Sequence, residues 1–117
     1  MIVDGVIKPI KLLVVIVDRG KGKNITKLLN SFDVVYNLIA LGEGTAPTEF
    51  QSYFGFGEPE KDIIFACPSI ENLSNVKTAL QELISEDTPN SGLAFTIPIT
   101  SVSGIKELKY ILGKTEG

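Results

Sequence analysis

Residues Leu12–Val17 form an uninterrupted apolar run dominated by β-branched side chains. Such a run predicts a strand at the centre of a sheet, covered on both faces, or by a helix on one face and a partner on the other. The following segment, residues 18–23, contains two glycines that interrupt any regular pattern. We therefore expect the chain to fold around this buried strand.

Two later segments have the apolar spacing of amphipathic helices. The first is expected to begin after Asn24 as the N-cap and to end at Asp33, and the second to be capped by Ser69 after Pro68. Apolar residues three and four apart mark the faces that these helices would bury. The first stripe comprises Ile25, Leu28, Leu29 and Phe32, and the second Leu73, Val76, Leu80, Leu83 and Ile84.

Three further strands are predicted, at residues 34–41, 62–67 and 93–97, with a short C-terminal helix beginning near Ile105. The order is then β-α-β-β-α-β. Right-handed crossovers give this order the ferredoxin-like α+β fold, an antiparallel four-stranded sheet with two helices on one face. The other face would be bare and apolar, so something must cover it. A trimer with three sheets facing inward is one solution.

We divide the chain into an N-terminal extension (residues 1–10), the β-α-β-β-α-β domain (11–104) and a C-terminal helix and tail (105–117). The length of 117 residues suits one domain. Within the domain, residues 43–58 form a long loop that contains four aromatic residues. Connections of this length in a compact domain are usually functional.

Composition excludes several kinds of function. The net charge of −3 gives no general attraction to nucleic acid or anionic membrane. The chain has no histidine, which removes the commonest general base and transition-metal ligand, and the single Cys67 cannot form an internal disulfide. Leu12–Val17 is too short to span a membrane, and no signal peptide is visible. We expect a cytoplasmic binding protein without side-chain catalysts or a bound metal.

The segment Arg19–Lys23 lies between a predicted strand and a predicted helix. Backbone N–H groups at a helix N-terminus, helped by cations such as Arg19 and Lys21, can hold an anion such as phosphate. The segment lacks the Gly-Lys-Ser/Thr ending of a Walker A motif. A solvated turn with exposed lysines is the alternative interpretation.

Two glycine-containing turns are further candidate ligand contacts. Gly42, Glu43, Gly44 and Thr45 would allow close approach of backbone to a ligand, or would simply form a bulge or turn. The turn Asn90, Ser91 and Gly92 could bond a phosphate or ribose, or serve as an ordinary connection between helix and strand.

The remaining candidates are aromatic or acidic. The loop aromatics Phe50, Tyr53, Phe54 and Phe56 could dock a partner protein or fold back on their own trimer. Glu58, Glu60 and Asp62 alternate along an extended segment and are interpreted as solvated charges rather than a metal or acid–base cluster. Cys67, which ends an apolar strand, is interpreted as an inert buried thiol.

Taken together, residues 11–104 resemble the PII family of nitrogen regulatory proteins. Leu41-Gly42-Glu43-Gly44 before a long loop is similar to the beginning of the family's T-loop. Pro59, a charged pair, an apolar strand and Pro68 repeat a spacing of the family, and Gly92–Pro98 falls at its last turn and strand.

The resemblance implies a trimeric signal protein. Such a protein binds an adenine nucleotide, and sometimes 2-oxoglutarate, between subunits and regulates a transporter, enzyme or transcription factor through its T-loop. It implies ligand contacts from residues 42–45, 90–92 and Lys61. Leu93 stands where the family has a phosphate-holding lysine, and residues 101–104 lack its two arginines. We therefore expect a divergent member with a rebuilt ligand site. A CutA-type trimeric module of the same fold is the alternative.

Overall fold

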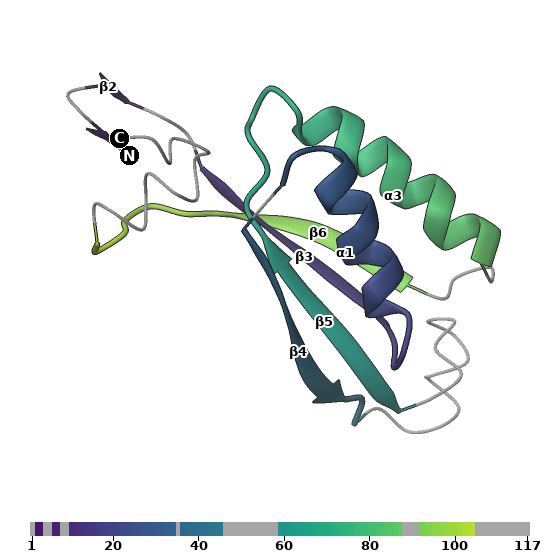
Figure 1. Cartoon of the computed structure of the whole chain (residues 1–117). Coiled ribbons are helices and arrows are strands. Elements are labelled where there is room, and N and C mark those ends of the chain that lie inside the picture. The colour runs from purple at the N-terminus through teal and green to yellow at the C-terminus, as the bar shows by residue number, and fades with distance from the viewer. Residues whose placement is uncertain are drawn as a thin grey trace.

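The computed structural model describes residues 2–3, 6–7, 10–34, 36–45, 59–87 and 92–104. Their main elements confirm the expected β-α-β-β-α-β order (Figure 1). These elements are β3 (Lys11–Asp18), α1 (Gly22–Ser31), β4 (Asn37–Glu43), β5 (Glu60–Ala66), α3 (Leu73–Asp87) and β6 (Gly92–Pro98).

The four long strands form one antiparallel sheet in the order β4-β5-β3-β6. The apolar run thus lies in a central strand, as predicted: Val15 is opposite Ile64 of β5 on one side and Ala94 of β6 on the other. After α1 the chain enters β4, which pairs with β5, and after α3 it enters β6, which pairs with β3. This is the ferredoxin-like arrangement.

The core lies between this sheet and the two helices, which pack on the same face (Figure 1). Side chains alternate between the faces of a strand, so β3 gives every second residue to the core. The helices contribute the stripes expected from their apolar spacing. The buried cluster contains Leu13, Val15, Val17, Ile25, Leu29, Val34, Ile64, Ala66, Val76 and Leu80.

The opposite face of the sheet is apolar and has no cover within the described residues. Register places Phe65, Val14 and Phe95 side by side on three adjacent strands of this face. The outer strand β6 is the most open, with Leu93 49%, Phe95 40% and Ile97 45% exposed. We call this surface, together with Leu12, Ile16, Leu38, Ala40 and Ile63, the open face. The predicted apolar face opposite the helices is therefore present among the described residues.

Several predicted boundaries were wrong. Helix α1 begins at Gly22, so Asn24 lies inside it, and α3 begins at Leu73, so Ser69 starts the preceding turn instead of capping. The carbonyl of Asn72 accepts the first helical bond of α3, and its side chain donates to the Phe32 carbonyl oxygen at 2.8 Å. That bond connects the end of α1 to the beginning of α3.

The end of α1 is close to its prediction. Asp33 follows the helix with a positive φ of 61°, and its amide and that of Val34 donate to Asn30 and Leu29. This is the Schellman arrangement, in which a left-handed residue ends the helix. The second strand is shifted from residues 34–41 to Asn37–Glu43 because these bonds hold Val34 at the helix end.

The N-terminal extension contains two short strands, β1 (Ile2–Val3) and β2 (Val6–Ile7), which pair with each other and form their own sheet. The predicted C-terminal helix lies outside the described residues.

Candidate functional site

The predicted ligand-binding residues gather at one end of the sheet, where four strands begin or end (Figure 1). Glu43 at the end of β4 is opposite Glu60, and Lys61 is opposite both Gly42 and Asp18. On the other side of β3, Gly92 is opposite Val17. The loop aromatics Phe50, Tyr53, Phe54 and Phe56, as well as Glu58, Asn90 and Ser91, lie outside the described residues.

The two ends of the 43–58 loop are held together by backbone contacts. The Gly44 amide donates a hydrogen bond to the Pro59 carbonyl oxygen. Close packing also restricts β4 here, because a Cβ added at Gly42 would lie 2.7 Å from Ile63 Cδ1. We call residues 42–45 and 59–61 the loop base.

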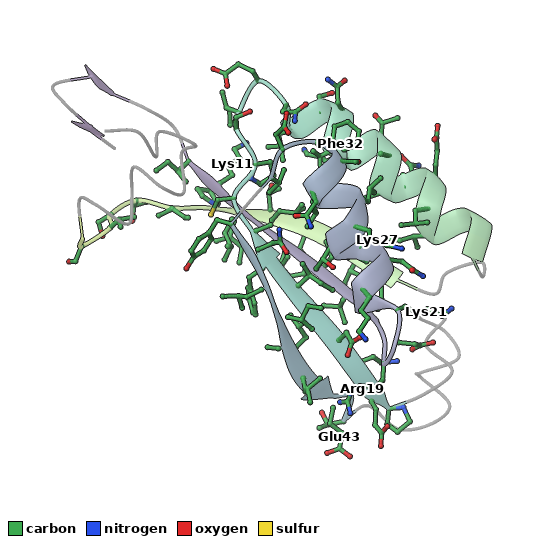
Figure 2. The ribbon with its side chains drawn as sticks, viewed as in Figure 1. Lys11, Arg19, Lys21, Lys27, Phe32 and Glu43 are labelled. Carbon is green, nitrogen blue, oxygen red and sulfur yellow. The ribbon has the colours of Figure 1, made fainter. Side chains whose placement is uncertain are left out.

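Arg19 lies across the loop base, next to the end of β4 that carries Glu43 (Figure 2). Its Nη2 donates to the Gly42 carbonyl oxygen at 2.8 Å, and its Nε donates to the Lys61 carbonyl oxygen at 3.2 Å. Its backbone amide donates to the Glu60 carbonyl oxygen at 3.1 Å. One side chain from the β3–α1 turn thus contacts both strands that flank the loop.

Asp62 is buried, which corrects its interpretation as a solvated charge. It is 6% exposed, and its Oδ2 accepts hydrogen bonds from the amides of Gly20 at 2.9 Å and Gly22 at 3.0 Å. Its Oδ1 is 3.4 Å from Arg19 Nε. The amides that were expected to attract an external phosphate therefore hold a carboxylate of the chain itself, favourably placed at the N-terminus of α1.

A second ion pair, which is largely buried, lies close by. Lys61 Nζ donates to Asp18 Oδ1 at 2.6 Å, and the two side chains are 7% and 16% exposed. Lys61 alternates with Ile63 and Phe65, so its side chain belongs to the open face at the loop base. Sequence reasoning proposed Lys61 as a ligand contact and missed Asp18. A buried pair of this kind is costly to break because the remaining charge loses its partner.

Other features carry less chemistry. Burial raises the pKa of the Cys67 thiol above its ordinary value, consistent with an inert thiol. The described residues form no cluster of three His, Cys, Asp or Glu side chains that could hold a metal. A groove of about 490 Å³ lies between α3 and β6, with Leu80, Ile84 and Ala94 among its apolar lining. Among the helices described, none is long and apolar enough to cross a membrane.

No protein-family model matches the chain, and no curated protein matches it in sequence. The fold is similar to that of CPII from Thiomonas intermedia K12, a nitrogen regulatory PII-like protein. Its apo form is 20% identical, with a TM-score of 0.58 over 78% of this chain and 89% of that chain. Its structure bound to ADP, AMP and acetate is 21% identical, with a TM-score of 0.59 over 80% and 91%.

CutA from Synechococcus elongatus PCC7942 is also similar: it is 10% identical, with a TM-score of 0.59 over 93% of this chain and 92% of that chain. At these identities the likeness establishes the fold. The chain has the ferredoxin-like fold that PII-like proteins and CutA share, so the resemblance predicted from the sequence is confirmed at the level of the fold.

Proposed function

We propose that the chain is a divergent PII-like regulatory protein of the cytoplasm, not an enzyme. It binds a small effector, an adenine nucleotide, in clefts between the subunits of a homotrimer. It acts in nitrogen metabolism by presenting the 43–58 loop to a transporter, an enzyme or a regulator. The observation that carries this proposal is that the loop base, Arg19 and Gly92 all lie at the same end of the sheet, with Gly42 and Gly92 on its two outer strands.

The open face supports the trimer. Fully burying a large apolar side chain contributes about 1.5–3 kcal/mol relative to leaving it exposed. Leu93, Phe95 and Ile97 are 40–49% exposed on a single strand, and their neighbours on β3 and β5 are also apolar. Covering this surface with copies of the chain would bring the loop bases of different subunits into one assembly.

The choice of nucleotide rests on CPII, which has been solved with ADP, AMP and acetate and with ADP, AMP and bicarbonate. In this chain the described residues at the loop base offer backbone amides and carbonyls, Arg19, and Lys21 at the start of α1. Cations at this position suit the phosphates of a nucleotide. The effector then biases the loop because its contacts lie at the loop base.

A CutA-type module is the second candidate. The likeness to CutA covers 93% of this chain, compared with 78–83% for the CPII structures. Such a module would use the same trimer and would not respond to nucleotides.

Titration calorimetry separates the two candidates. ATP, ADP, AMP and 2-oxoglutarate are titrated into the purified protein, whose mass in solution is measured in parallel. The PII-like proposal predicts binding of at least one nucleotide, weakened by Lys21→Ala and unchanged by the matched variant Lys27→Ala on the exposed side of α1 (Figure 2). A trimer that binds none of the four compounds would favour the CutA-type module.

A further inference from the structure

Arg19 connects the two ends of a long loop through a single guanidinium group. Gly42, whose carbonyl oxygen accepts from Nη2, precedes the loop, and Lys61, whose carbonyl oxygen accepts from Nε, follows it. These bonds span 23 and 42 residues of sequence. Arg19 is therefore placed to hold the strands β4 and β5 at the point where the loop leaves the sheet.

Arg19 is itself oriented by a carboxylate that is fixed in position. Asp62 Oδ1 lies 3.4 Å from Arg19 Nε, while the other oxygen of Asp62 is held by the amides of Gly20 and Gly22. Glu60 contributes little, because its Oε2 is 3.9 Å from Nη1 and its side chain is 64% exposed. The geometry of the guanidinium thus depends on Asp62 and on the glycine turn.

The guanidinium remains accessible in part. The Arg19 side chain is 36% exposed, and arginine carries five N–H donors in a planar fork. The described contacts use Nε and Nη2 for the two carbonyls. A phosphate binds such a fork through two parallel bonds between opposite charges, whereas the Gly42 carbonyl is a single neutral acceptor.

We infer that Arg19 is the positioning residue that sets the conformation of the loop base, and that a phosphate group of the effector competes with Gly42 for its guanidinium. This rests on the proposed function. Without effector, Arg19 holds the Gly42 carbonyl and keeps the loop base closed. With effector, the guanidinium turns to the phosphate and Gly42 is released. The phosphate contacts Arg19 in only one of the two states of the loop base. Because a ligand shifts a conformation only through such a difference in contacts, effector binding favours the released state.

The first test needs no ligand. Amide hydrogen exchange is measured for the wild type, Arg19→Lys and Arg19→Gln, with Lys27→Gln as a control that removes a cation from the exposed side of α1. We expect the Gly44 amide, which donates to Pro59, to exchange about tenfold faster in both Arg19 variants. Amides of Val76 and Leu80 in α3 should be unchanged. The inference is overturned if Gly44 exchange is unchanged, or if all amides accelerate by the same factor.

The second test adds a nucleotide. ADP and adenosine are titrated into the wild type and Arg19→Lys, because lysine keeps the charge and loses the planar fork. We expect the affinity for ADP to fall about tenfold, while adenosine, which lacks phosphate, binds both proteins equally. Equal ADP affinities would overturn the competition between phosphate and Gly42. Absence of ADP binding to the wild type would defeat the proposed nucleotide function, while the exchange measurement still decides whether Arg19 positions the loop.

Discussion

The carboxylate of Asp62 lies 3.0 Å from the amide nitrogen of Gly22, the first residue of α1. A side chain from β5 thereby satisfies one of the first amides of the helix, whose N-cap residue Lys21 makes no side-chain capping bond. The contact joins the N-terminus of α1 to the strand that follows the long loop. Local structure at the site consequently depends on residues that are distant in the sequence.

Replacing Asp62 with asparagine should destabilise the fold. The variant loses the negative charge beside Arg19 and at the helix N-terminus, and we expect the free energy of unfolding to fall by about 1–3 kcal/mol. Denaturant unfolding measures the change. Glu60→Gln is the matched control, because Glu60 is on the same strand with a 64% exposed side chain and should cost less than about 0.5 kcal/mol. Equal losses in both variants would refute the role assigned to Asp62.

Gly22→Ala tests the closeness of the same contact. Alanine is favoured over glycine within a helix by about 1 kcal/mol, yet its Cβ would lie 2.8 Å from Asp62 Oδ2. We expect the variant to be less stable than the wild type by about 1–3 kcal/mol because the crowding outweighs the helix propensity. In an Asp62→Ala background, which removes the carboxylate, the same substitution should cost less. A stabilising effect of Gly22→Ala in the wild-type background would contradict the described geometry.

The open face should control assembly. Ile97→Asp places a charge on this face, and we expect it to convert the proposed trimer into a folded monomer, because a buried unpaired charge is far costlier than the lost apolar contact. Analytical ultracentrifugation and circular dichroism report mass and folding. Ile70→Asp is the matched control, since Ile70 is 39% exposed in the turn before α3. If Ile97→Asp keeps the wild-type mass, the open face is not the subunit interface.

Cys67 should resist modification in the folded protein. Burial raises the pKa of its thiol, so at pH values near 8.5, where a free thiol is half ionised, the folded state carries less thiolate. The folded state favours the neutral thiol, and the contribution of this thiol to the free energy of unfolding is fully present below that pH. The contribution is lost as the pH rises through the folded-state pKa. Labelling with a thiol-specific disulfide reagent should be slow in buffer and fast in denaturant. Equal rates would show that the thiol is exposed.

Much of the fold could be predicted from the sequence because it depends on local periodicity. The run Leu12–Val17 has no polar interruption, which marks a central strand, and the helical stripes place the core. The beginning of α1 was missed because its first amide, that of Gly22, bonds Asp62, 40 residues away in the sequence, and no local side-chain cap marks the boundary.

The candidate site was predicted only in part. Glycines and cations near strand ends identified Gly42, Gly44 and Arg19, whose positions at the loop base the structure describes. The partners Asp18 and Asp62 were missed because a carboxylate is more often exposed than buried. A signal was nevertheless present: Asp62 alternates with Ile64 and Ala66, so a strand through these residues points its carboxylate toward the helices.

The central claim, that an effector binds at the loop base, is tested most directly by amide chemical shifts of the labelled protein during titration with ADP. The account predicts that the largest changes fall on Arg19, residues 42–45 and Gly92, at one end of the sheet. Changes centred instead on Lys77 and Gln81, which line the groove between α3 and β6, would contradict it, as would the absence of any change.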